Sequence, residues 1–245
     1  MLAILGGSGL THLTNMEGAR REIVRTPYGE PSGPLTLGQI CGRPTVFLAR
    51  HGYGHTIPPH EVNYRANIWA LREMGATAII AVASVGGIRA DLHPGDIVVP
   101  DQVVDYTWGR RSTFHEGESC TVTHIDFTDP YDETLRQKIL ASAQLAGVSV
   151  KNGATYATTQ GPRLETAAEI RRLERDGCDV VGMTGMPEAS LAREIDIPYA
   201  AINVIANYAA GKGDSAHGIH FDAINAVLEE TMGKVRVILE RLAAC

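Results

Sequence analysis

Short apolar runs recur along the chain and are separated by stretches in which apolar positions follow a helical period. Ala78–Ser84 is the clearest run, because Ala-Ile-Ile-Ala-Val-Ala-Ser contains no charged side chain. An uninterrupted apolar run of this kind is typical of a strand buried on both faces of a sheet. Similar runs predict strands at Leu2–Leu5, Ala154–Thr159, Val180–Met183 and Tyr199–Ala206.

Turn residues mark the positions of three further strands. Leu35–Cys41 and Thr45–Arg50 flank Gly42-Arg43-Pro44, a pattern that predicts a hairpin. Val98–Pro100 follows the turn Pro94-Gly95-Asp96 and predicts a short strand.

Helical periodicity identifies several of the segments between the strands. His60–Met74 keeps its apolar side chains on one face, and Gly75 ends it. Thr166-Ala-Ala-Glu169 is a capping box, which predicts a helix from there to about Leu173. Further helices are predicted at Glu133–Ala146, at Pro187–Ala192 and from about Asp222 to Leu242.

The alternation of strands and helices predicts an α/β fold with a central mixed sheet flanked by helices. Residues 105–130 show no periodic pattern and predict a long loop. Loops of this length inside compact domains usually carry function or pack against a partner. No internal repeat, low-complexity tract or linker interrupts the sequence, so we predict one domain over residues 1–245.

Composition narrows the class of protein and its location. The chain has 245 residues, 44% of them hydrophobic, and a net charge of −6 without any basic run, so nucleic acid is a poor partner. Its four cysteines are scattered, which indicates free thiols in a reducing compartment. No signal peptide or membrane-spanning run is evident in the sequence. We therefore expect a cytoplasmic protein that binds neither nucleic acid nor a membrane.

A glycine-rich turn, Gly6-Gly7-Ser8-Gly9, follows the first predicted strand. Such turns present backbone N–H groups that can hold an anion, and Ser8 adds a hydroxyl. The spacing lacks the third glycine of a dinucleotide-binding fingerprint. A tight structural turn and an anion site therefore both fit this segment.

Three more polar side chains stand at the ends of predicted strands. Arg50 offers a forked donor for phosphate and His51 can add another donor, although a surface salt bridge would use the same residues. Thr184 offers a hydroxyl to an anion or a sugar, or it caps the following helix. All three lie at strand-to-loop junctions, which is where α/β sheets collect their ligands.

A metal site is the other chemistry that the histidines could indicate. His217-Gly-Ile-His220 has a spacing near that of metal ligands, and His55 and His60 add two more candidates. No cysteine or carboxylate cluster completes a tetrahedral set of ligands. We therefore predict no metal ion and no cofactor.

The chain resembles the trimeric purine nucleoside phosphorylases, and most closely their methylthioadenosine phosphorylase branch. The resemblance covers essentially the whole chain and depends on blocks that occur in the same order. These are Gly6-Gly7-Ser8-Gly9-Leu10, Ala49-Arg50-His51-Gly52, Val62–Leu71, Pro94-Gly95-Asp96-Ile97-Val98, Gly161-Pro162-Arg163 and Met183-Thr184-Gly185-Met186-Pro187-Glu188.

The resemblance implies phosphorolysis of a purine nucleoside, in which phosphate is a co-substrate and attacks C1′ as the base leaves. Catalysis of this kind is mainly positioning and electrostatics. It also implies a homotrimer. By position, the family pattern assigns Met183 and the backbone near Ser84 to the ribose, and it assigns Ser8, Arg50, His51 and Thr184 to phosphate.

The base site departs from the methylthioadenosine pattern. That branch has Asp where this chain has Asn207 and Ala209, and it lacks the carboxylate of Glu165. At Glu165 and Asn207 the chain is similar to the branch specific for inosine and guanosine. An amide that donates to O6 and accepts from N7–H, beside a carboxylate that accepts from N1–H, complements a 6-oxopurine. The same pair opposes the lone pair at N1 of adenine.

The second feature of the substrate to be predicted is the group at the 5′ position of the sugar, either methylthio or hydroxyl. Phe221 and Ile224 stand where the methylthio branch has apolar residues, and His124 of the long loop is expected to reach in from a neighbouring subunit. An apolar pocket favours S-methyl-5′-thioinosine, whereas His217 and His220 could serve a 5′-hydroxyl. Phe221 and Ile224 could also be ordinary helix packing.

Several other functions therefore stay open at the level of sequence. An inosine and guanosine phosphorylase is the first alternative, and a methylthioadenosine phosphorylase is the second. A nucleotide-sensing protein that keeps the fold without turnover is the alternative from another class.

Overall fold

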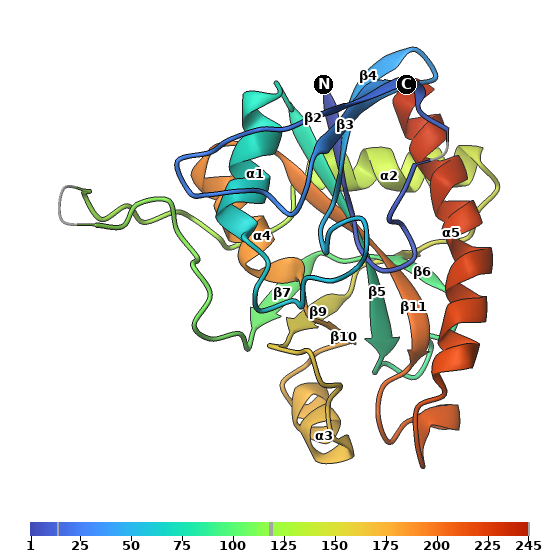
Figure 1. Cartoon of the computed structure of the whole chain (residues 1–245). Helices are drawn as coiled ribbons and strands as arrows, with labels where there is room; N and C mark the ends of the chain where they lie inside the picture. Colours follow the sequence, from blue (N-terminus) through green and yellow to red (C-terminus); the bar gives the residue numbers. More distant parts are fainter. Residues whose placement is uncertain (14, 118–119, 245) are drawn as a thin grey trace.

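The computed structural model describes residues 1–13, 15–117 and 120–244, with helices on both faces of a twisted sheet (Figure 1). The strands are β1 (Leu2–Gly6), β2 (Glu17–Glu22), β3 (Leu35–Ile40), β4 (Arg43–Ala49), β5 (Ala78–Gly87), β6 (Ile97–Val99), β7 (Gln102–Asp105), β8 (Lys151–Asn152), β9 (Thr155–Thr158), β10 (Val180–Gly182) and β11 (Tyr199–Tyr208). The helices are α1 (Tyr64–Glu73), α2 (Glu133–Leu145), α3 (Ala167–Arg175), α4 (Gly185–Glu194) and α5 (Phe221–Ala244), and a short 3-10 helix covers Gly213–Ser215.

The strand β5 organises the sheet. β1 and β11 pair with it in parallel on opposite edges, and β4 continues the parallel part beyond β1. β1 ends at Gly6 opposite Val82, so β5 runs on past it and pairs antiparallel with β10 at Gly86 and Gly87. The carboxyl ends of β1, β4 and β11 therefore meet beside the second half of β5. Ligands of α/β proteins usually bind at such an edge.

Alternation along the central strands divides the apolar core between the two faces of the sheet. Leu2 and Ile4 of β1 belong to the cluster that α2 and α5 cover. Ala3 and Leu5 belong to the cluster that α1 and α4 cover. Because successive side chains of a strand point to opposite faces, a strand covered on both sides must be apolar at every position. This explains the uninterrupted apolar runs in the sequence.

The predicted α/β class with a mixed sheet flanked by helices is confirmed. The capping box is also present, because Glu169 N–H donates to Thr166 Oγ1 at 3.1 Å and Thr166 N–H donates to Glu169 Oε2 at 2.7 Å. α1 begins at Tyr64, later than predicted, since Asn63 Oδ1 accepts from Ala66 N–H at 3.1 Å and so caps the helix.

Three strands, β2, β7 and β8, were not predicted. β7 reads Gln-Val-Val-Asp, and two apolar residues between polar ones form no clear run. β2 reads Glu-Gly-Ala-Arg-Arg-Glu and lies at one end of the sheet order, mostly exposed, so it carries no apolar signal. β8 consists of Lys151 and Asn152 and is too short to produce a pattern. Strands of this kind are defined by pairing with a neighbour, which sequence periodicity does not report.

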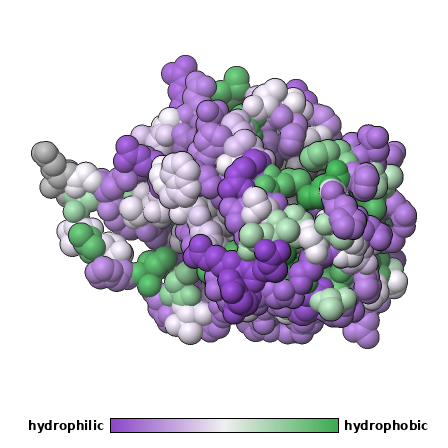
Figure 2. Space-filling view, turned by 90° about the horizontal axis from the view of Figure 1, so that it is seen from below, coloured by the Kyte–Doolittle hydropathy of each residue, from purple (hydrophilic) through white to green (hydrophobic). Residues whose placement is uncertain are grey.

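The long segment between β7 and α2 has no helix or strand in its described residues, as predicted. It leaves the body and projects outward in both views, as the green trace at the left of Figure 1 and the arm at the left of Figure 2. Across the described ranges, no helix has the length and apolar character needed to cross a membrane.

Candidate active site

A cavity of about 670 Å³ opens at the carboxyl ends of the parallel strands. Figure 2 shows this side of the molecule, where apolar side chains appear between polar ones. Apart from three histidines described below, the site residues predicted from the sequence line this cavity. They are Ser8, Arg50, His51, Ser84, Glu165, Met183, Thr184, Asn207, Phe221 and Ile224.

The turn after β1 brings the backbone close to β5 and to Arg50. Gly7 N–H donates to Val82 O at 3.0 Å. A Cβ atom at Gly7 would lie 2.7 Å from Val82 O and 2.8 Å from Arg50 Nη1, so this close approach requires glycine. Ser8 follows directly and lines the cavity, with its Oγ 3.5 Å from His55 Nε2.

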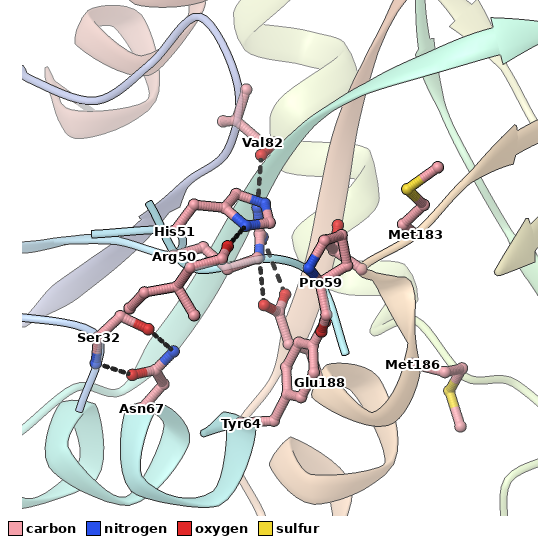
Figure 3. Close-up of polar contacts among 12 residues, drawn as sticks. Ser32, Arg50, His51, Pro59, Tyr64, Asn67, Val82, Met183, Met186 and Glu188 are labelled. Atoms are coloured by element: carbon pink, nitrogen blue, oxygen red, sulfur yellow. Dashed lines mark hydrogen bonds and ion pairs between the residues drawn. The ribbon is translucent and has the colours of Figure 1, made fainter. Parts of the chain in front are cut away.

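Arg50 forms a fully buried ion pair and not the surface salt bridge that the sequence left open. Its Nε and Nη2 donate to the two carboxylate oxygens of Glu188, the latter at 2.9 Å, and its Nη1 donates to Val82 O at 3.1 Å (Figure 3). Burial opposes the charge, but the Glu188 carboxylate more than offsets it and raises the pKa of Arg50. The guanidinium has five N–H donors, so these partners leave two of them unused.

His51 is held as a neutral ring. Burial and the neighbouring Arg50 charge lower its pKa to about 4. Its Nδ1 lies 2.8 Å from Ile57 O, and because a carbonyl only accepts, Nδ1 carries the hydrogen. Above pH 4 the remaining nitrogen, Nε2, is then an acceptor. His51 can therefore accept a hydrogen from a ligand and does not supply the second donor that the sequence suggested.

His55 is a cavity residue to which the sequence analysis gave no role beyond a candidate metal ligand. It lines the cavity, its ring centroid lies 4.9 Å from that of His51, and its backbone is left-handed with φ 52°. A non-glycine residue in that region is held there by its surroundings. Within the described ranges, no group of three or more His, Cys, Asp or Glu side chains is arranged to hold a metal ion.

Thr184 stands at the start of α4, but its side chain makes no capping hydrogen bond. Its backbone N–H donates to Tyr156 Oη at 3.3 Å, and the residue is 6% exposed at the cavity. The helix-cap interpretation of the hydroxyl is therefore wrong. The backbone leaves helical angles at Met186 and Pro187, so Thr184 does not precede a regular first helical turn, and its hydroxyl lines the cavity without a capping role.

Met183 joins this end of the cavity to the loop that follows β9. Gly161 of that loop has φ 61°, and a Cβ atom there would lie 2.5 Å from Met183 Sδ. The positive φ favours glycine at this position, and the side chain of Met183 packs directly against it. The loop packs directly on Met183 and continues to Glu165.

Glu165, at the end of this loop, and Asn207 of β11 are polar residues that line the cavity. Thr159 Oγ1 donates to Glu165 Oε1 at 2.6 Å, and burial raises the pKa of Glu165. Asn207 Nδ2 donates to Tyr208 O at 2.6 Å, which fixes the orientation of the amide. One carboxylate oxygen of Glu165, and one N–H and Oδ1 of Asn207, are left for a ligand.

A bulge in β11 explains how Asn207 reaches the cavity. Ile205 pairs with Val85 and Asn207 with Gly86, so Ala206 is an extra residue in β11. Ala206 and Asn207, although adjacent, both line the cavity. Bulges change the direction of side chains beside functional sites in this way.

The other end of the cavity is apolar and belongs to the start of α5. Phe221 and Ile224 line it together with Ile219 and Leu228, and Phe221 is 64% exposed at the rim. Asn225 is a polar neighbour that the sequence analysis did not assign.

Three histidines that the sequence connected with the 5′ group lie elsewhere. His217 and His220 are exposed and are not among the residues that line the cavity. His124 lies on the projecting segment, exposed and away from the cavity of its own chain. Its contribution to a neighbouring copy stays a prediction.

The fold and the cavity together define an enzyme of the nucleoside phosphorylase class. The chain belongs to the phosphorylase superfamily, whose family model matches residues 1–244. The resemblance seen in the sequence is thereby confirmed.

Known relatives agree with this assignment. The probable S-methyl-5′-thioinosine phosphorylase of Pseudomonas syringae pv. tomato is 51% identical over 240 residues, which cover 98% of this chain and 97% of the relative. The 6-oxopurine nucleoside phosphorylase of Pyrococcus furiosus is 44% identical over 243 residues, covering 97% and 90%. Methylthioadenosine phosphorylase from Schistosoma mansoni, solved in complex with adenine, superposes with a TM-score of 0.95 at 34% identity, covering 99% and 90%.

Proposed function

We propose that this protein is a phosphorylase of 6-oxopurine nucleosides and that S-methyl-5′-thioinosine is its preferred substrate. An oxygen of inorganic phosphate bonds to C1′ of the ribose while the bond between C1′ and purine N9 breaks. The products are hypoxanthine and 5-methylthioribose 1-phosphate, and no cofactor takes part. The observation that carries the proposal is that Glu165 and Asn207 line one cavity with Ser8 and Thr184.

The base end of the cavity supports a 6-oxopurine. The second N–H of Asn207 Nδ2 can donate to O6, and Oδ1 can accept from N7–H as the base leaves. Glu165 can accept from N1–H. Adenine would place the N1 lone pair against this carboxylate, and each unpaired or repelling buried group costs about 1–3 kcal/mol. A site that depends on such polar contacts discriminates strongly between the two bases.

The anion end supports phosphate as the nucleophile. Arg50 keeps two N–H donors beyond those used by Glu188 and Val82, and the Ser8 and Thr184 hydroxyls line the same cavity. Inorganic phosphate carries at least one hydrogen near neutral pH, which the neutral His51 can accept at Nε2. These groups position the nucleophile below the sugar, whose ribose we assign to Met183 and the backbone at Ser84.

The apolar end supports a methylthio group on the sugar. Burial of that group against Ile224 and Phe221 favours it over a hydroxyl, which would lose water there. The Pseudomonas syringae relative carries a name with the same substrate. Asn225 is the one observation that favours an ordinary inosine and guanosine phosphorylase, because its amide could meet a 5′-hydroxyl.

We also propose that the enzyme is a homotrimer in which His124 of one copy reaches the sugar of the next. The projecting position of the segment that carries His124 supports this arrangement. Light scattering would give the mass of the assembly. His124→Ala should raise the KM for the nucleoside without changing that mass; an unchanged KM would remove His124 from the site. The expected cytoplasmic location stays a prediction.

A substrate panel tests the proposed function. Hypoxanthine and adenine nucleosides, each with a 5′-hydroxyl or a 5′-methylthio group, would be compared by kcat/KM with and without inorganic phosphate. We expect methylthioinosine to be best and cleavage to stop without phosphate. Base release at an undiminished rate in phosphate-free buffer would indicate a hydrolase. Inosine matching methylthioinosine would favour the ordinary phosphorylase, and faster adenine nucleosides would reverse the base assignment.

A further inference from the structure

We propose that Arg110 is a positioning residue that fixes the base end of the cavity relative to the ribose and phosphate end. It comes from the long segment between β7 and α2 and is not among the residues that line the cavity. Its side chain instead joins two segments that contribute lining residues, the start of α4 and the loop after β9. The inference rests on the proposed function, because the segments that it joins are those to which we assign base, ribose and phosphate.

One side of the guanidinium holds the segment at the start of α4. Arg110 Nη1 donates to Met183 O at 2.8 Å and to Met186 O at 2.7 Å. The two carbonyls flank Thr184, so the backbone on both sides of this phosphate-end residue is anchored to one nitrogen. Tyr64 Oη also lies 3.0 Å from Nη1, so three acceptors share the two hydrogens of this nitrogen. Tyr64, Met183 and Met186 are labelled in Figure 3.

The other side of the guanidinium holds the loop after β9. Arg110 Nη2 donates to Thr159 O at 3.2 Å and to Gln160 O at 2.9 Å. Thr159 in turn donates through Oγ1 to Glu165 at 2.6 Å. The carboxylate assigned to the base is thus one hydrogen bond away from a backbone that Arg110 anchors.

The partners of Arg110 explain why this position needs arginine. They are backbone carbonyls, the Tyr64 hydroxyl and the side-chain oxygen of Gln160, and in the described chain Arg110 forms no ion pair with a carboxylate. A planar fork can donate to two backbone segments at once, whereas the three donors of an ammonium group radiate from a single nitrogen. Arg110 therefore sets the separation of the two segments, and with it the alignment of phosphate, C1′ and base.

Arg111 provides a matched control. It is the next residue, with the same charge and the same chain length, but its side chain is 73% exposed and contacts Glu116 at the surface. We compare Arg110→Ala with Arg111→Ala by kcat/KM for the 6-oxo and 6-amino nucleosides, and by thermal unfolding. A misplacement of reacting groups by about 1 Å costs about a hundredfold in rate, so Arg110→Ala should lose about that factor for the 6-oxo nucleoside. Arg111→Ala should stay near wild type.

Two readouts separate positioning from general support of the fold. The ratio of 6-oxo to 6-amino turnover should fall in Arg110→Ala, because Glu165 loses its fixed place. Free guanidinium at tens of millimolar should restore a large part of the lost rate by occupying the vacated donor site, without raising the Tm. A loss with an unchanged ratio and no rescue would overturn the proposal, as would a variant equal to Arg111→Ala.

A second variant keeps the test open if Arg110→Ala does not fold. Arg110→Lys retains the charge and the aliphatic part of the side chain but cannot donate to both segments as the guanidinium does. The ratio of 6-oxo to 6-amino turnover should therefore fall in this variant as well. An unchanged ratio would again overturn the proposal. The wild-type measurements separate this result from failure of the proposed function. If the wild-type enzyme prefers adenine nucleosides, the proposed base preference is wrong. The rescue of Arg110→Ala by guanidinium can still be measured with the adenine nucleoside, and it then tests the positioning role of Arg110 alone.

Discussion

Asn207 is the residue whose chemistry bears most directly on the choice of base. Asn207→Asp keeps an acceptor for N7–H but places a carboxylate oxygen against O6. Loss of a transition-state donor costs about 2–4 kcal/mol. The activation free energy for the 6-oxo nucleoside should therefore rise by that amount, and its kcat/KM should fall accordingly. The kcat/KM for the 6-amino nucleoside should fall less. The measurement is the ratio of kcat/KM for methylthioinosine to that for methylthioadenosine.

The controls for this prediction separate the base site from its surroundings. Asn225→Asp introduces the same charge at the other end of the cavity and should leave the base ratio unchanged. Asn207→Asp combined with Glu165→Ser should move the ratio further toward adenine, because the carboxylate opposite N1 is also gone. An unchanged ratio in Asn207→Asp would show that Asn207 does not read the base.

The buried pair of Arg50 and Glu188 couples phosphate binding to stability. Arg50→Ala leaves the Glu188 carboxylate buried without its partner, and breaking a buried pair typically costs about 3–5 kcal/mol. This variant should therefore lower the free energy of unfolding as well as raise the KM for phosphate. Arg50→Met with Glu188→Gln removes both charges and should recover much of the stability while the phosphate KM stays high.

Denaturant unfolding and phosphate titration of the three variants check this prediction. If the double variant recovered phosphate affinity along with stability, Arg50 would act only through the fold. Glu188→Gln alone is the complementary control, because it keeps the guanidinium but removes its countercharge.

The sequence predicted which side chains meet at the cavity but not which partners they have. Ser8 and Thr184 follow strands and Asn207 lies near the end of β11, and the pairing of these strands with β5 brings the three positions together. Glu188 is different, because it lies 138 residues from Arg50 and nothing local indicates the pair. The tautomer of His51 likewise depends on the carbonyl of Ile57, which only the folded loop brings near.

At the scale of elements, the start of α5 controls the sugar end of the cavity. Ile224→Ser replaces an apolar wall by a hydroxyl. Burial of a thiomethyl group is worth about 1–2 kcal/mol, so the preference for methylthioinosine over inosine should fall about tenfold. Val237→Ser also replaces a β-branched apolar side chain by serine on the same helix, but at a position that does not line the cavity, and it should leave the preference unchanged. An unaltered preference in Ile224→Ser would leave this helix without a part in 5′ recognition.

The elements themselves were predictable to different degrees. Strands covered on both faces, such as β5 and β11, can be predicted because their sequences are uninterrupted apolar runs. The bulge at Ala206 could not be predicted in this way. The extra residue leaves the apolar run unbroken, although it changes the direction of the Asn207 side chain. Edge strands such as β2 are polar and depend on the pairing partner.

At the scale of the whole molecule, the titration of His51 affects both the stability of the fold and the part of the cavity that we assign to phosphate. Burial and the Arg50 charge, with smaller effects of His55 and Arg110, lower the pKa of His51 from 6.5 to about 4. The unfolded chain therefore binds more protons than the folded one between these two values. Stability should rise with pH across this window and should lose up to about 3 kcal/mol as the pH falls from 6.5 to 4.

His51→Asn isolates this effect. The amide nitrogen of asparagine occupies roughly the place of Nδ1 and can still donate to Ile57 O, but it does not titrate. The measurement is the free energy of unfolding of both proteins from pH 4 to pH 7.5. Their difference should widen in favour of the variant below pH 6.5, while the carboxylates, including Glu165 with its raised pKa, contribute equally to both and cancel. Parallel curves for the two proteins would mean that His51 is not held neutral by the fold, and its assignment as an acceptor of a phosphate hydrogen would then fail as well.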